Sequence, residues 1–199
     1  MEKERLVTFT DAVLAIIMTI LVLELKKPTE PTLAQMWALR ESFLAYALSF
    51  FWLGAMWINI HNIWSKASKI STRVIGWNMV LLFFLSLIPY TTSLVSTYYD
   101  NAVIQGLYGV VVIIISIVNI GLNKMLQGAN KDNKSLKKIT KRYIDALVID
   151  IDIKIVGLII AISIYPQAMM ISVFITSVLM ARIKNWLSKN NNYILTNNK

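Results

Sequence analysis

Residues 6–25 read LVTFTDAVLAIIMTILVLEL, an apolar stretch with two charged residues, Asp11 near its start and Glu24 near its end. At about 1.5 Å rise per residue, a helix of this length crosses a hydrocarbon core about 30 Å thick. Lys26, Lys27 and Pro28 follow directly, and both charge and proline oppose continuation of the helix. These residues predict a membrane-spanning helix near the start of the chain.

The whole chain of 199 residues has the composition of a membrane protein. It is 56% hydrophobic and 16% charged, with a mean hydropathy of +0.58. Soluble domains are roughly 45–50% apolar and about 25% charged, and disordered chains are less apolar still. The sequence has no cysteine and one histidine, His61, so it offers no disulfide and no Cys-ligated metal site, and a multi-His site would need several subunits.

Five further apolar segments follow the first, so we predict an all-α, polytopic membrane protein with six transmembrane helices. The fifth segment is the most polar, but Asp150 and Lys154 lie four residues apart and can pair on one helix face. We expect residues 1–189 to form one transmembrane domain and the Asn-rich tail 190–199 to be disordered. The predicted spans are 6–25, 42–64, 74–97, 102–126, 143–165 and 167–187.

Basic residues are distributed unevenly around these spans. Sixteen of the 20 Lys and Arg residues fall on one side, most densely in the connection 124–142, and the other side has only Lys26, Lys27 and Arg40. The positive-inside rule therefore places both termini in the cytoplasm. The basic connection can also bind anionic lipid headgroups, and the alternative that it only sets orientation stays open. A cleaved signal peptide is disfavoured, because no small-residue cleavage site follows the first segment.

The first helix carries a carboxylate at the edge of the membrane. Asp11 lies about 9 Å along the helix axis beyond Arg5, where a charge is costly unless it is paired or faces protein or water. The same depth in the second and third spans holds Trp57, Trp64 and Trp77, which we interpret as ordinary interfacial aromatic residues. The polar groups expected to form one network there are Arg5, Thr10, Asp11, His61, Asn62 and Asn78.

A helical wheel separates this network from a second face of the first helix. At about 100° per residue, Asp11 and Ile16 are about 140° apart. We assign the Asp11 side to neighbouring helices of the same subunit, while the Ile16 side faces lipid, another subunit or a pore; periodicity does not choose among these. The Ile16 side comprises Phe9, Ala12, Ile16, Thr19, Ile20 and Leu23.

The start of the first helix resembles that of the transmembrane protein 175 potassium channels, a family with an Arg-x-x-x-Phe-Ser-Asp motif there. The corresponding residues are Arg5, Phe9, Thr10 and Asp11. Thr10 stands in place of the serine, which keeps the hydroxyl and adds a methyl group. The resemblance covers the first three spans, and the last three only in hydropathy. Its further matches are Trp57, His61 and Asn62 in the second span and Trp77 and Asn78 in the third.

This resemblance implies a passive, potassium-preferring channel in a bacterial plasma membrane, with no cofactor beyond the permeant K⁺. Family members with one six-helix repeat assemble as homotetramers, and the first helix of each repeat lines the pore. On that likeness Ile16 is the hydrophobic gate and Thr19 the polar ring associated with cation preference, while Ile20 and Leu23 extend the pore outwards. The sequence contains no Thr-Val-Gly-Tyr-Gly filter, so selection would depend on a side-chain constriction.

Two other classes of protein remain as alternatives. A secondary transporter could use Asp11 and His61 as a proton relay, although no inverted repeat is visible and Pro89 is the one obvious helix breaker. An intramembrane enzyme would need a nucleophile–base pair or a metal cluster. Asp150 and Asp152 are two residues apart and point to different helix faces, so we expect them to meet the basic loop or solvent rather than form a dyad.

Overall fold

The computed structural model describes residues 2–181, and all regular secondary structure within them is helical. Four segments are long and apolar enough to cross a membrane, namely α1, α3, α4 together with α5, and α6. The predicted tail 190–199 lies outside the described residues. The labelled helices are α1 (Lys3–Leu23), α2 (Leu33–Ala38), α3 (Arg40–Trp64), α4 (Thr72–Ser86), α5 (Ile88–Thr97), α6 (Ala102–Ala129) and α7 (Lys134–Ser163). A further helix, Ala168–Ala181, follows them.

Each of the six predicted stretches is mostly helical over its described part, and the boundary that differs most from the prediction is the start of the fifth. We expected the fifth helix to begin near residue 143, whereas α7 begins at Lys134. Asn133 caps it by accepting a hydrogen bond from the backbone N–H of Leu136. Its first turns are amphipathic, because Leu136 and Thr140 are buried on one face while most of the lysines lie on the other. The short α2 was not predicted.

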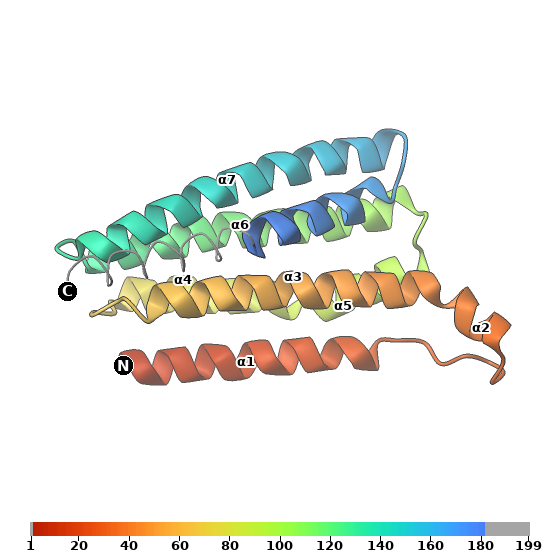
Figure 1. The fold of residues 1–199 in the computed structure, drawn as a ribbon, viewed down its shortest axis with the longest axis horizontal. Coiled ribbons are helices and arrows are strands. Elements are labelled where there is room, and N and C mark those ends of the chain that lie inside the picture. Colours follow the sequence, from red (N-terminus) through yellow and green to blue (C-terminus); the bar gives the residue numbers. More distant parts are fainter. Residues whose placement is uncertain (1, 182–199) are drawn as a thin grey trace, which may run out of the picture.

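The helices form a layered bundle (Figure 1). The layer of α3, α4 and α5 lies in the middle, with α1 on one side and α6 and α7 on the other. The most extensive contacts are those between α6 and α7 and between α4 and α6. At the second of these contacts, a Cβ atom on Gly121 would come within 2.4 Å of the Trp77 ring. A small residue at this position lets the two helices approach, as is common in membrane proteins.

The connections gather at the two ends of the bundle according to their charge. The start of α1, the connection 65–71 and the connection 130–133 lie at one end, and α2 lies at the other (Figure 1). The two basic connections are joined, because the Asn130 side chain accepts from the backbone N–H groups of Ser68 and Lys69. At the opposite end the Gln167 amide donates to Asp100. The basic segments that the sequence assigned to one side therefore meet in space.

The third predicted span is interrupted in its middle. The first half, α4, ends at Ser86, and the second half, α5, begins at Ile88 with Pro89 in its first turn. Proline has no backbone N–H and cannot continue the hydrogen-bonding pattern of α4. The span continues in nearly the same direction beyond the break (Figure 1).

Candidate functional site

One stripe of α1 is buried against the rest of the chain. Its members recur every three or four residues, which is the period of a helix face, and they pack on α3, α4 and α5. Asp11 lies at the margin of this stripe and is half-buried. The buried residues are Leu6, Thr10, Leu14, Ile17 and Leu21.

The other side of α1 is uncovered in a single chain. The side chain of Ile16 is 57% exposed and that of Leu23 is 78% exposed, with Phe9 and Ile20 also open. Thr19 is exposed, and its hydroxyl donates to the backbone carbonyl of Ile16 at 2.9 Å. The predicted pore residues therefore share one exposed and largely apolar face. Monomeric soluble proteins rarely expose such a surface, and it marks contact with lipid, protein or both.

A polar cluster joins the beginning of α1 to the end of α3. The indole N–H of Trp57 donates to Asp11 Oδ1 at 2.8 Å, and His61 Nδ1 lies 3.6 Å from Asp11 Oδ2. The rings of Trp57 and His61 are 5.7 Å apart at their centroids. The carboxylate is thus held by two side chains of α3, although about a third of its surface stays exposed in the single chain.

A second polar contact joins α1 to α4 and is completely buried. The hydroxyl of Thr10 donates to the carbonyl of Leu6 at 2.8 Å and accepts from Asn78 Nδ2 at 2.9 Å. Thr10, which differs by one methyl group from the serine of the family motif, is only 2% exposed. A hydroxyl or amide group left without a hydrogen-bond partner between two helices costs free energy. The bond between Thr10 and Asn78 therefore stabilises the contact of α1 with α4.

The structure divides the predicted network into these two separate contacts. Arg5 and Asn62 lie on the surface, and their side chains make no hydrogen bond or ion pair with another residue between 2 and 181. The interfacial interpretation is wrong for Trp64, which is buried within the bundle. Trp57 is partly exposed but binds Asp11.

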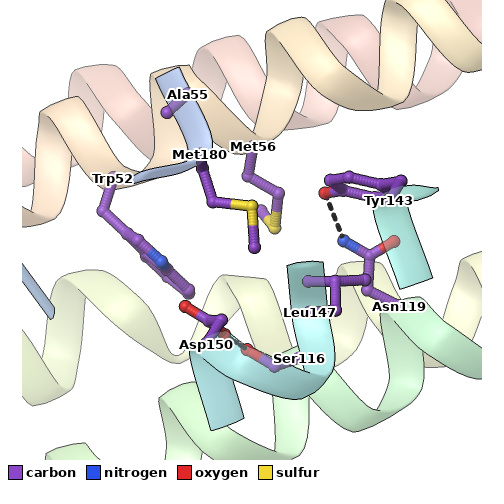
Figure 2. Close-up of a pocket in the computed structure, with 9 residues that line it drawn as sticks. All are labelled: Trp52, Ala55, Met56, Ser116, Asn119, Tyr143, Leu147, Asp150 and Met180. Atoms are coloured by element: carbon purple, nitrogen blue, oxygen red, sulfur yellow. Dashed lines mark hydrogen bonds between the residues drawn. The ribbon is translucent and has the colours of Figure 1, made fainter. Parts of the chain in front are cut away.

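A third polar cluster lies between α6 and α7 (Figure 2). As the spacing predicted, Lys154 Nζ binds Asp150 Oδ2 at 2.8 Å. The expectation that Asp150 meets solvent or the basic loop is wrong, because both side chains are buried and Ser116 of α6 donates to the carboxylate at 2.6 Å. The feature of the sequence that could have indicated this cluster is Ser116, a polar residue in the largely apolar helix that faces α7. Asp152 is exposed.

Within the described part of the chain, no group of three or more His, Asp or Glu side chains could hold a metal ion. The fold and the clusters instead define a multi-pass α-helical membrane protein whose polar side chains join helices to one another.

Comparison with known proteins identifies the family. The family model described as "Endosomal/lysosomal potassium channel TMEM175" matches residues 5–89. A potassium channel of Chryseobacterium sp. is 36% identical over 138 residues, covering 69% of this chain and 72% of that protein. A potassium channel of Chamaesiphon minutus is 31% identical over 157 residues, covering 71% of this chain and 77% of that protein. The chain belongs to the TMEM175 family.

A solved structure agrees with this assignment. The crystal structure of a homologue of the lysosomal potassium-selective channel TMEM175, from Chamaesiphon minutus, has a TM-score of 0.73 and 25% sequence identity to this chain. The match covers 90% of this chain and 96% of that one. The fold described above is therefore the fold of a TMEM175 homologue over nearly its whole length.

Proposed function

We propose that this protein is a passive, potassium-preferring cation channel in a bacterial plasma membrane. The observation that carries the proposal is the exposed face of α1, which presents Ile16, Thr19, Ile20 and Leu23 on one side of an apolar helix. Membership of the TMEM175 family and the names of the bacterial relatives support potassium as the ion. Such a channel is not an enzyme and uses no cofactor beyond the K⁺ that passes through it.

The assembly that would use this face is a homotetramer with four copies of α1 around one axis. A single chain leaves α1 uncovered on one side, and residues of that side can form rings only when several copies meet. The six helices would span the membrane, including the polar α7, with both termini in the cytoplasm. The meeting of the basic connections at one end of the bundle supports this orientation.

Ile16 would form the gate of this pore. A narrow ring of apolar side chains holds water and ions poorly until it widens, so it closes by dewetting. Thr19 would place hydroxyl groups one turn further out, and these would favour one hydrated cation over another. Because the sequence has no carbonyl-lined filter motif, selection would be weaker than in channels that replace the whole hydration shell.

The basic connection 124–142 would contact anionic lipid headgroups at the cytoplasmic surface. Each Lys or Arg near such a surface contributes about 1 kcal/mol of attraction. Lys137, Lys138 and Lys141 lie exposed on the first turns of α7. Replacing these three lysines by Gln should weaken any stimulation of flux by phosphatidylglycerol. Stimulation that survives the replacement would leave these residues with a role in orientation only.

A proton-coupled transporter is the second candidate, and one observation favours it. His61 and Asp11 lie 3.6 Å apart at the end of α3, where a proton could pass between them. Such a protein would move its substrate uphill when a pH gradient is imposed, whereas a channel dissipates gradients.

Flux into proteoliposomes distinguishes these functions. Potassium, sodium and proton gradients are imposed separately. If the protein is a channel, we expect potassium to flow down its own gradient without a second substrate. Replacing Ile16 by Ser should increase the conductance, because a polar ring stays hydrated. Unchanged conductance in this variant would remove Ile16 from the gate. Uphill transport driven by pH would instead favour the transporter and direct attention to Asp11 and His61.

A further inference from the structure

The ion pair of α7 is enclosed by three helices. Lys154 Nζ binds Asp150 Oδ2 at 2.8 Å and Ser116 Oγ of α6 at 3.0 Å. The same ammonium group lies 4.7 Å from the centre of the Trp52 ring of α3, within the range of a cation–π interaction. Lys154 and Asp150 are 0% and 1% exposed. The cluster therefore joins α3, α6 and α7 in the interior of the subunit.

One atom of this cluster has no partner. Asp150 Oδ1 is buried and accepts no hydrogen bond from any residue between 2 and 181. The indole N–H of Trp52 donates to no residue between 2 and 181, and Trp52 as a whole is only 4% exposed. A buried acceptor without a partner costs about 1–3 kcal/mol, and more when it is charged, while a buried Trp N–H usually finds an acceptor.

Both residues line one small cavity (Figure 2). The cavity is bordered by α3, α6 and α7 and by Met180, and Figure 2 shows the Trp52 indole and the Asp150 carboxylate on the same side of it. The space open to the centre of a water molecule within it measures about 20 Å³. One water molecule needs about 10–15 Å³ on this measure.

We propose that this cavity is a binding site for a single water molecule, which donates to Asp150 Oδ1 and accepts from the Trp52 indole N–H. The ligand must be small and neutral, because the ammonium group of Lys154 already balances the carboxylate and would repel a cation. The water completes the hydrogen bonding of a charged pair that has no access to bulk solvent. This site lies inside the subunit, so the inference does not depend on the proposed pore.

The cavity carries its own reporter, because the side chain of Met56 lines it. A millisecond X-ray pulse splits bound water into hydroxyl radicals, and a radical that adds to the sulfur of a methionine beside the cavity gives the sulfoxide after further oxidation by dissolved oxygen. Met169 and Met170 are buried but do not line the cavity, so they give the background rate. In the full-length protein in detergent, mass spectrometry should find Met56 oxidised several-fold faster than these two.

Two substitutions test the source of the radicals. Trp52→Phe keeps an aromatic ring, removes the N–H donor and adds only apolar space to the cavity, so it should lower the rate at Met56 towards that of Met169. Trp64→Phe changes another buried tryptophan that does not line the cavity, and should leave the rate at Met56 unchanged. The proposal is overturned if Met56 in the native protein is oxidised no faster than Met169 and Met170. It is also overturned if Trp52→Phe leaves the rate at Met56 as high as in the native protein.

Discussion

Two carboxylates on the long helices, Asp11 and Asp150, show opposite ways of placing a charge in a membrane protein. Asp11 lies at the end of the bundle, about a third exposed, with Trp57 and His61 as partners. Asp150 lies inside the bundle and is bound to Lys154 and Ser116. The partners of Asp11 also reach the surface, whereas the charge of Asp150 is neutralised by Lys154 inside the bundle. A charge far from water needs a counter-charge, but a charge near the surface needs only orientation.

The largest loss of stability is expected at the buried pair of Asp150 and Lys154. Replacing Lys154 by Met leaves Asp150 buried without its counter-charge, and breaking such a pair costs about 3–5 kcal/mol. The thermal unfolding temperature in detergent should fall by many degrees, or the folded protein should be lost.

The double variant Asp150→Leu with Lys154→Met is the matched control. It removes both charges together and leaves apolar side chains in an apolar setting, so it should recover most of the lost stability. If Lys154→Met unfolds at the same temperature as the native protein, Lys154 does not stabilise the buried carboxylate of Asp150.

The next effect concerns the buried contact beside Asp11. Replacing Thr10 by Val keeps the shape and removes the acceptor of the Asn78 amide, which is itself fully buried. The loss should be about 1–3 kcal/mol of stability, measured as a lower unfolding temperature. Thr10→Ser, which keeps the hydroxyl, should stay close to the native protein. Equal stability in Val and Ser variants would show that the hydroxyl contributes nothing.

A smaller effect is expected from Asp11 itself. Replacing Asp11 by Ala removes the acceptor for Trp57, but the site is partly exposed, so the loss should be about 1 kcal/mol. Folding or assembly should suffer more than ion preference, which size-exclusion chromatography and flux measurements test together. A stable assembly with altered ion preference would place Asp11 in the ion pathway and weaken the contrast with Asp150.

The smallest effect on stability is expected at Thr19. Its hydroxyl is bonded only within its own helix, so Thr19→Val should change stability by less than about 0.5 kcal/mol. Under the proposed function the same variant changes the ratio of potassium to sodium flux. An unchanged flux ratio would separate Thr19 from cation preference.

The fold was largely predictable because a bilayer imposes a length and a composition on each helix. The alternation of basic connections also indicated which ends of the helices meet. The boundary of α7 was not predictable from hydropathy, because its first turns combine a buried face of Leu136 and Thr140 with exposed lysines. The short α2 depends on a local cap by Thr32 and gave no apolar signal.

The polar contacts were predictable only in part. Spacing alone indicates that Asp150 and Lys154 can pair, since both belong to one helix. It does not show that Ser116 and Trp52 of other helices enclose them, because that depends on how three helices are rotated about their axes. For the same reason the sequence grouped Thr10 with Asp11, whereas the structure directs Thr10 to α4 and Asp11 to α3.

The most direct test of the central claim uses the fact that the chain has no cysteine. Leu23 and Val22 are both exposed on α1, but their side chains point about 100° apart. A cysteine at each position can be modified in turn by a water-soluble methanethiosulfonate reagent added from outside, while potassium flux is recorded. The account predicts that modification blocks flux in Leu23→Cys and leaves Val22→Cys unaffected. Persistent flux through modified Leu23→Cys, or a block at Val22→Cys alone, would contradict a pore lined by this face of α1.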